Sequence, residues 1–292
     1  RVPRATLVPS NASRQADYAE PMFSRRHTTQ VEERYRRRFI GDVEYHTSRS
    51  GYGDASLMAY RFDCQVPEKT GPDFVLVHGI GVSARMYGPT AVELAQRGDV
   101  HLIDMAGYGR SPRPGRDLTI ADHAELIARY LEEHDLDHPV VVGHSMGAQV
   151  VAELAAGFPE QVDHIALIAP VVAPSARSLT KAVPLLLANG LKEPGVVTFL
   201  AVYDYLFRTG VRYMIRQTPH LLKAHLDEIA ARVEAKTLVI CGLDDRIVPL
   251  EWGRELAGRF RHGWYATVPG PHATMFAAPA TIAALIDEHA HR

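Results

Sequence analysis

Short, continuous apolar runs alternate with amphipathic stretches of helical period along most of the chain. The apolar runs are rich in β-branched residues and predict strands at residues 74–77, 100–103, 140–142, 165–168, 237–241 and 264–268. The amphipathic stretches predict helices, among them residues 89–97 and 119–134, the second with Thr119 and Asp122 as its N-terminal cap. Apolar strands that alternate with helices are typical of a parallel sheet covered on both faces, so the pattern predicts the α/β class.

A different pattern precedes this region. Alternating apolar and polar residues at 39–46 and 56–62 predict the two strands of a hairpin, with residues 51–54 as its turn. Residues 1–38 have little periodicity, and we interpret them as an N-terminal arm. Acidic residues accompany the arginine cluster at 34–38, so we expect a solvated helix face there rather than a basic interaction patch.

The alternation of strands and helices breaks between residues 171 and 231. This region contains several prolines, apolar helical pieces and five aromatic residues. We interpret it as a helical lid inserted over the strand ends, and we expect most of its aromatic side chains to form its own packing core. The expected division is an N-terminal arm at 1–38, a core at 39–170 and 232–292, and a lid at 171–231.

Composition narrows the possible functions. The 292 residues are 46% hydrophobic, enough for one large domain, and the formal charge of −2 gives no bulk field that favours nucleic acid or an anionic membrane. No apolar run is long enough to span a membrane. Cys64 and Cys241 lie far apart, so we expect free, buried thiols. A cytoplasmic location is favoured because no signal-type segment is visible in this sequence, while monomer and homodimer both remain open.

The candidate chemistry begins at residues 143–147, Gly-His-Ser-Met-Gly, which follow a predicted strand and precede a predicted helix. This order places Ser145 on a sharp strand-to-helix turn, where Gly143 and Gly147 leave room for the strand and the helix to close around it. A serine hydroxyl needs a base, and the base needs an acidic partner. The candidate base is His272, in a Gly/Pro loop after the last strand. The candidate acid is Asp244 or Asp245 after the strand at 237–241, and the residues alone leave both open.

Hydrolysis of an acyl group also needs donors for the developing oxyanion. One candidate is the backbone N–H of Met146, which follows the serine at a helix start. The second is the N–H of Ile80, because Gly79 and Gly81 allow the loop after residues 74–77 to approach closely. We expect His144 to be structural rather than a second base.

The sequence favours no metal and no cofactor. It contains no H-E-x-x-H motif, no cysteine cluster and no Walker-type lysine. The Gly107–Gly109 pair does not continue into a dinucleotide-binding fingerprint, because Pro112 stands where the third glycine belongs. We interpret the segment after Asp104 as a turn that shapes the floor of the site.

These motifs together resemble the α/β-hydrolase superfamily across residues 39–292. The matching segments are residues 78–81, 104–111, 143–147, 158–162, 242–249 and 270–272. The resemblance implies the α/β-hydrolase fold, an eight-stranded, mostly parallel sheet with a lid inserted after the sixth strand. It also implies that the acid is the third residue after Gly242, which selects Asp245.

Subfamily features favour an esterase-like enzyme. A serine nucleophile is unlike the aspartate of haloalkane dehalogenases and epoxide hydrolases. C–C hydrolases of meta-cleavage products carry Asn before the serine, a Gly-Gly pair after it and Trp after the base, where this chain has His144, Gly147-Ala148 and Ala273. Met146 and the Ile80 loop resemble those of lid-bearing esterases, lactonases and cofactor-free haloperoxidases.

The resulting hypothesis is a serine hydrolase that cleaves a small, fairly hydrophobic carboxylic ester or lactone through Ser145, Asp245 and His272. Candidate pocket residues are His78 and Gly79 from the oxyanion loop and Tyr203 and Phe207 from the lid. One alternative is C–C hydrolysis of a diketone. The other is a ligand-binding module with a vestigial triad.

Overall fold

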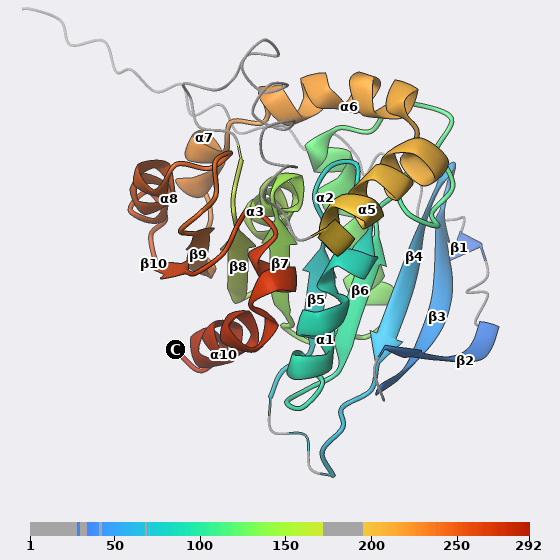
Figure 1. Cartoon of the computed structure of the whole chain (residues 1–292), viewed down its shortest axis with the longest axis horizontal. Helices are drawn as coiled ribbons and strands as arrows, with labels where there is room; N and C mark the ends of the chain where they lie inside the picture. Colours follow the sequence, from blue (N-terminus) through green and yellow to red (C-terminus); the bar gives the residue numbers. More distant parts are fainter. Residues whose placement is uncertain (1–27, 30–33, 41–42, 68, 70, 172–194) are drawn as a thin grey trace, which may run out of the picture.

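One twisted sheet runs through the protein, and its strand order is β1-β3-β4-β6-β5-β7-β8-β9-β10, with β2 paired to β3 (Figure 1). The computed structural model describes residues 28–29, 34–40, 43–67, 69, 71–171 and 195–292. The strands are β1 (Thr28–Thr29), β2 (Arg34–Ile40), β3 (Val43–Tyr52), β4 (Ala55–Phe62), β5 (Phe74–Val77), β6 (Val100–Asp104), β7 (Val140–His144), β8 (His164–Ile168), β9 (Lys236–Gly242) and β10 (Gly263–Val268).

Six neighbouring strands of the sheet, β6, β5, β7, β8, β9 and β10, are parallel. Next to β6, the strands β4 and β3 continue the sheet with antiparallel pairing. Every residue of β5, β6 and β7 is buried, as expected for strands covered on both faces. These eight strands form the sheet that the resemblance implied, and β1 and β2 extend it at the antiparallel edge. The carboxyl ends of the parallel strands meet at one edge, where sites form in such sheets.

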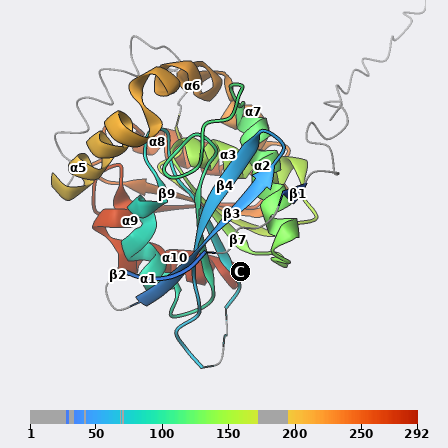
Figure 2. The same cartoon turned by 90° about the vertical axis from the view of Figure 1, so that its right-hand side faces the viewer.

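Helices cover both faces of the sheet. They are η1 (Ala84–Tyr87), α1 (Gly88–Leu94), α2 (Ile120–Glu133), α3 (Met146–Gly157), α5 (Gly195–Tyr203), η3 (Asp204–Thr209), α6 (Val211–Lys223), α7 (Leu226–Ala230), α8 (Leu250–Ala257), α9 (Thr274–Ala277) and α10 (Pro279–Ala290). Helices α1 and α10 pack together on one face, and α2 and α3 pack together on the other (Figure 2). The predicted cap of α2 is confirmed as a capping box between Thr119 and Asp122. No helix in the described part of the chain has the length and apolar character to cross a membrane.

The prediction of a helix face for the arginine cluster is wrong. Arg34–Ile40 form β2, which pairs antiparallel with β3. Pairing with an adjacent strand supplies backbone hydrogen bonds that a charge pattern does not reveal, and Tyr35, Phe39 and Ile40 are good strand formers. The expected arm boundary at residue 38 therefore falls inside a strand, while residues 1–27 lie outside the described residues.

The segment between β8 and β9 is helical over its described residues, which are α5, η3, α6 and α7. Residues 172–194 of the predicted lid lie outside the described part. The expectation that most of these aromatic side chains form the lid's own packing core is wrong, because three of the five are exposed: Phe199 by 66%, Tyr203 by 38% and Phe207 by 74%. Tyr213, by contrast, is buried. Almost every residue of α5 is apolar, and the buried residues of η3 are the polar Asp204 and Thr209, so the hydrophobic pattern does not show which side of either helix faces the core.

The fold predicts a loss of stability in acid. Burial is the largest cause that lowers the pKa of His123 to about 3. In the unfolded chain His123 binds a proton near pH 6.5, whereas in the folded protein it does so only near pH 3. The unfolded state therefore gains protons first as the pH drops. The contribution of His123 to the free energy of unfolding is complete above pH 6.5 and falls as the pH drops toward 3. The expected loss is about 2 kcal/mol between pH 6.5 and pH 5.

Urea unfolding of the wild type and of His123→Phe at pH 7.5 and pH 5 measures this contribution. The variant should lose less stability between the two pH values. The same substitution at the exposed His262 controls for the loss of one histidine. An equal loss in the wild type and in His123→Phe would contradict the prediction.

Candidate active site

Ser145 occupies a strained turn between β7 and α3. Its backbone angles are φ 57° and ψ −114°, a conformation that L-residues rarely adopt. Its N–H donates to the carbonyl of Ile168 at 2.9 Å, which ties the turn to the end of β8. Such strain persists only where the surrounding structure imposes it, and it is frequent at functional sites.

Close packing of the first turn of α3 imposes this conformation. A Cβ on Gly147 would lie 2.3 Å from the carbonyl oxygen of Val77 and 2.6 Å from that of His78. Only glycine fits where the helix crosses the end of β5, because any side chain on Gly147 would overlap these two carbonyl oxygens. The helix start and the loop after β5 are therefore neighbours on the same edge of the sheet.

His272 and Asp245 form a buried pair on the same edge. Nδ1 of His272 lies 2.8 Å from Oδ2 of Asp245, and both side chains are almost fully buried. The second carboxylate oxygen accepts the N–H groups of Ile247 and Val248, at 2.7 and 3.1 Å. Burial alone would raise the pKa of Asp245, but the charge and hydrogen bond of His272 and the two N–H donors outweigh it and lower the pKa. The carboxylate is thus ionised and directs one imidazole nitrogen.

The structure distinguishes the two neighbouring aspartates. Asp244 is exposed, whereas Asp245 holds His272. The N–H of Asp244 donates to the carbonyl of Gly270 at 3.0 Å, so the loops after β9 and β10 are joined through the backbone. The Asp245–His272 pair results from this contact between adjacent parallel strand ends.

The two expected oxyanion donors lie beside the serine. Met146 is the first residue of α3, where helix geometry leaves the N–H without an intrahelical acceptor. A Cβ on Gly79 would lie 3.0 Å from Cβ of Ser145, so the loop that carries Ile80 also reaches the serine. Among the residues that the structure describes, neither the Ile80 N–H nor the Met146 N–H has an acceptor. Their role in an oxyanion hole stays a prediction that this placement supports.

A link between the serine and the base runs through His144. This residue directly precedes Ser145, and its Nε2 lies 3.2 Å from the carbonyl oxygen of His272. No hydrogen bond joins the hydroxyl of Ser145 to His272 within the described residues. Catalytic hydrogen bonds are often long in the absence of substrate and shorten in its complex.

His78 connects two loops instead of offering a free nitrogen to a pocket. Its Nε2 accepts the N–H of Met105 at 3.1 Å, so Nδ1 carries the proton and donates to the carbonyl of Gly79 at 2.7 Å. Burial lowers the pKa of this imidazole and keeps it neutral. Both nitrogens have backbone partners and the side chain is fully buried, which gives no support to its assignment as a pocket residue.

Asp104 is a structural residue whose importance the sequence only partly indicated. The buried carboxylate accepts the hydroxyl of Tyr60 at 2.7 Å and the N–H groups of Ala84 and Arg110 at 2.8 Å each. It therefore joins β4, the segment after the oxyanion loop and the turn after β6. In the sequence, the feature that could have indicated this structural role was an acidic residue at the end of an apolar strand, directly before a glycine-rich turn.

The helical segment between β8 and β9 packs on the loops that surround the serine. A Cβ on Gly81 would lie 2.7 Å from side-chain atoms of both Met214 and Tyr205, and a Cβ on Gly107 would lie 2.5 Å from Tyr213. The segment thus covers the carboxyl ends of β5 and β6. The covering residues were not among the predicted pocket residues, because apolar character alone did not separate inward from outward positions.

The two predicted pocket residues of this segment, Tyr203 and Phe207, are both exposed. The guanidinium groups of Arg85 and Arg208 lie near the ring of Tyr203, at 5.3 and 5.7 Å from its centroid. Their exposure gives no support to the pocket assignment, which stays a prediction. Buried Asp204 beside them accepts the hydroxyl of Ser83 at 2.6 Å and pairs with Arg85, which fastens η3 to the core.

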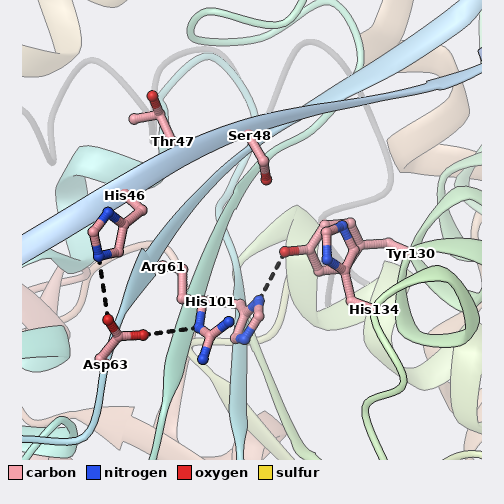
Figure 3. A pocket seen from close by; sticks show the side chains of 8 residues that line it. All are labelled: His46, Thr47, Ser48, Arg61, Asp63, His101, Tyr130 and His134. Carbon is pink, nitrogen blue, oxygen red and sulfur yellow. Dashed lines mark hydrogen bonds and ion pairs between the residues drawn. The ribbon is translucent and has the colours of Figure 1, made fainter. Parts of the chain in front are cut away.

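A polar cavity of about 240 Å³ lies beside His101, near the amino end of β6 (Figure 3). It is lined by His46, Thr47, Ser48, Arg61, Asp63, His101, Tyr130 and His134. Its buried imidazole, that of His101, is hydrogen-bonded through Nδ1 to the hydroxyl of Tyr130 at 2.7 Å.

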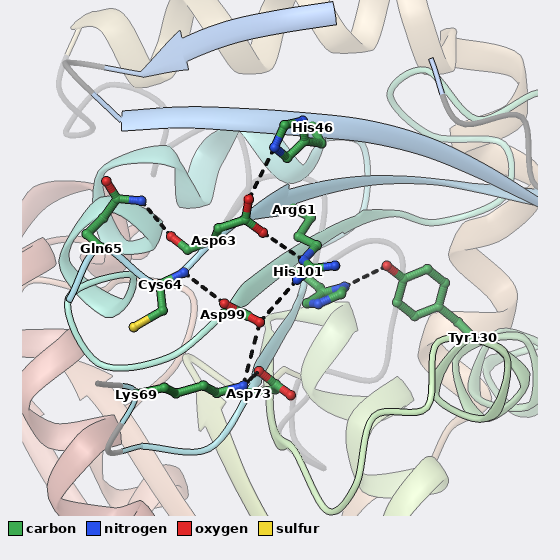
Figure 4. A network of polar contacts seen from close by, with 10 residues as sticks. All are labelled: His46, Arg61, Asp63, Cys64, Gln65, Lys69, Asp73, Asp99, His101 and Tyr130. Carbon is green, nitrogen blue, oxygen red and sulfur yellow. Dashed lines mark hydrogen bonds and ion pairs between the residues drawn. The ribbon is translucent and has the colours of Figure 1, made fainter. Parts of the chain in front are cut away.

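The ionised groups at this cavity neutralise one another (Figure 4). Arg61 pairs with Asp63 at 3.0 Å and with Asp99 at 3.3 Å, and Lys69 pairs with Asp99 at 3.6 Å. These pairs connect β4 to the start of β6, so we assign them a structural role. No cluster of three or more potential metal ligands occurs among the described residues, here or at the serine.

The fold, with a serine turn at the carboxyl edge of a mostly parallel sheet, is that of the α/β hydrolases, and comparisons with known proteins agree. A family model described as alpha/beta hydrolase fold matches residues 72–219. The chain is 30% identical over 244 residues to a "Putative non-heme haloperoxidase" of Mycobacterium phage D29, covering 74% of this chain and 87% of that protein. The chain therefore belongs to the α/β-hydrolase family.

Two further similarities accompany this assignment. A pimeloyl-[acyl-carrier protein] methyl ester esterase of Chromobacterium violaceum is 29% identical over 214 residues, which cover 64% of this chain and 81% of the esterase. The crystal structure of an enol-lactonase from Burkholderia xenovorans superposes with a TM-score of 0.71 at 18% identity, over 84% of this chain and all of the lactonase. At this identity the lactonase shows a common fold.

Close packing at Gly147 predicts a large effect of one methyl group. Gly147→Ala should destabilise the protein by about 2 kcal/mol or more, because the new Cβ would overlap two backbone carbonyl oxygens that cannot move independently. Gly195→Ala is the matched control, since among the described residues no atom beyond its chain neighbours and the backbone of its own helix lies within 4 Å of its Cβ position. The free energies of unfolding from urea titration measure both. Equal stability of the two variants would contradict the packing argument.

Proposed function

We propose that the protein is a serine hydrolase that cleaves a carboxylic ester or lactone through an acyl-enzyme on Ser145. The observation that carries the proposal is the buried Asp245–His272 pair at the sheet edge where the strained Ser145 turn also lies. Nδ1 of His272 faces the carboxylate, so the proton of a neutral imidazole stays on Nδ1 and the lone pair stays on Nε2. That nitrogen is the proton acceptor that a serine nucleophile needs.

In the acylation step, Oγ of Ser145 attacks the carbonyl carbon of the ester while Nε2 of His272 takes the hydroxyl proton. The negative charge that develops on the carbonyl oxygen is stabilised by the N–H groups of Ile80 and Met146. The imidazolium then gives its proton to the leaving alkoxide as the C–O bond breaks. Asp245 stabilises the imidazolium in this interval because its carboxylate is already ionised.

Deacylation repeats these roles with water. His272 takes a proton from the water as it attacks the acyl carbon, and the second tetrahedral oxyanion occupies the same two N–H donors. Collapse of this intermediate expels Oγ of Ser145, which recovers its proton from His272 and releases the carboxylic acid. Every proton taken by His272 is returned, so the cycle needs no cofactor.

The esterase from Chromobacterium violaceum supports an ester as substrate, since it aligns over most of both chains. The helical segment over the strand ends supports a fairly hydrophobic substrate, because the side chains that it places against the Gly81 and Gly107 loops are those of Tyr205, Tyr213 and Met214. In this proposal the segment acts as a lid that admits the substrate and excludes bulk water from the serine.

Substitution of the nucleophile is the first test. Ser145→Ala should lower kcat/KM for short-chain aryl esters by about four orders of magnitude or more, because no other hydroxyl replaces the attacking oxygen. A fluorophosphonate probe should label the wild type and leave the correctly folded variant unlabelled. Near wild-type hydrolysis by the variant would refute the mechanism, and an unlabelled wild type that still binds esters would indicate a binding module. A panel with one lactone and one diketone then decides the substrate class.

The adjacent aspartates provide a matched pair of variants. Asp245→Asn should lower kcat by roughly 10³- to 10⁴-fold, because the amide can donate to Nδ1 and favour the wrong tautomer of His272. Asp244→Asn, one residue away and exposed, should change kcat by less than about twofold. Steady-state kinetics with one aryl ester measure both. Comparable losses in the two variants would remove Asp245 from the proposed role.

A further inference from the structure

His144 is the last residue of β7, and its buried imidazole lies between the oxyanion loop and the loop that carries His272. Nε2 is 3.2 Å from the main-chain carbonyl oxygen of His272. The two imidazole rings are also in contact, with centroids 4.7 Å apart and planes inclined by 56°. On the opposite side, a Cβ on Gly79 would lie 3.1 Å from Nδ1 of His144. The ring is therefore held in one place by both loops.

The protonation of this ring follows from its partner. A carbonyl oxygen only accepts hydrogen bonds, so Nε2 of His144 carries a proton and donates it to His272. Burial, followed by the charge of nearby His272, lowers the pKa of His144 to about 3, so the imidazole is neutral near pH 7. Nδ1 is then a buried lone pair with no partner among the described residues. An unpaired buried nitrogen costs free energy, so stability alone does not favour histidine at this position.

The position of His272 depends on more than Asp245. Within the described residues, the His272 side chain is held by the hydrogen bond from Nδ1 to Asp245 and by its contact with the His144 ring. Gly270, two residues earlier, has a φ of 130°, a conformation open to glycine. The hydrogen bond from His144 fixes the backbone of His272 to the end of β7. Because Ser145 follows directly in the turn after β7, two consecutive residues place the nucleophile and the base.

We propose that His144 is a positioning residue that holds His272 at the distance from Ser145 that proton transfer requires. The proposal rests on the hydrolase function argued above. His144 transfers no proton in the reaction, since its Nε2–H stays on the carbonyl oxygen of His272. Its contribution is to the geometry of the base, and displacements of about 1 Å at such sites lower rates by about 100-fold.

Three variants test the proposal on an aryl ester. His144→Leu and His144→Met remove the donor at similar side-chain volume, and kcat should fall by about 30-fold while KM changes by less than about twofold. His144→Gln keeps an N–H donor near the position of Nε2, so kcat should return to within about fivefold of the wild type. The rate constant of fluorophosphonate labelling at Ser145 should follow kcat, which makes the result independent of the choice of ester.

His289 offers a matched control at the opposite edge of the sheet. Its buried Nε2 lies 3.1 Å from the carbonyl oxygen of Lys236, at the start of β9, and burial is the largest cause that lowers its pKa to about 4. His289→Leu therefore removes the same kind of hydrogen bond away from the serine. Its kcat should be unchanged, and urea unfolding shows whether this variant and His144→Leu are both folded.

The outcomes separate this proposal from the hydrolase function. Full loss of activity in Ser145→Ala with wild-type kcat in folded His144→Leu would overturn the positioning role alone. Activity retained by Ser145→Ala would overturn both. A parallel fall of kcat in His289→Leu, or equal losses in the Leu, Met and Gln variants of His144, would also overturn the positioning role. If neither donor-free variant folds while His144→Gln folds with wild-type kcat and labelling rate, the role of His144 is in stability.

Discussion

The turn at Ser145 is the constraint on which the candidate site depends. A non-glycine residue with φ 57° and ψ −114° costs on the order of 1–3 kcal/mol, so the surrounding structure must hold it. Two contacts do so: the crossing of Gly147 over the carbonyl oxygens at the end of β5, and the hydrogen bond from Ser145 to Ile168. The same geometry directs the first N–H groups of α3 toward the serine, where an oxyanion would form.

Hydrogen bonds of buried polar side chains hold the neighbouring loops in place around this turn. His78 joins the loops after β5 and β6, Asp104 joins the latter to β4, and His144 joins the end of β7 to His272. Each of these groups is fully or almost fully buried and bonded to the backbone of another segment. The site is therefore a set of strand ends held in register by hydrogen bonds, which suits a mechanism in which atoms must be positioned within a fraction of an ångström.

The helical segment between β8 and β9 has two different sides. Tyr205, Tyr213 and Met214 pack against the glycine turns of the core, while buried Asp204 fastens η3 through Ser83 and Arg85. Phe199 and Phe207 face outward. The sequence predicted a helical lid over residues 171–231, but it assigned Tyr203 and Phe207 to the pocket. An apolar segment packed on a single side has no polar stripe to mark its outer surface, so periodicity could not orient it.

The sequence by itself determined the α/β class, the parallel strands and the α2 cap, and it predicted Ser145, His272 and one of the adjacent aspartates Asp244 and Asp245 as candidate residues. Continuous apolar strands, turn glycines and the order of motifs are local properties, and the carboxyl ends of parallel strands must meet at one edge. Only the tertiary structure decided that Arg34–Ile40 form a strand, that Asp245 rather than Asp244 contacts His272, and that His144 bonds the carbonyl of His272. These features depend on contacts between residues that are far apart in the chain. A local sequence pattern does not show which distant residues will be in contact in the folded protein.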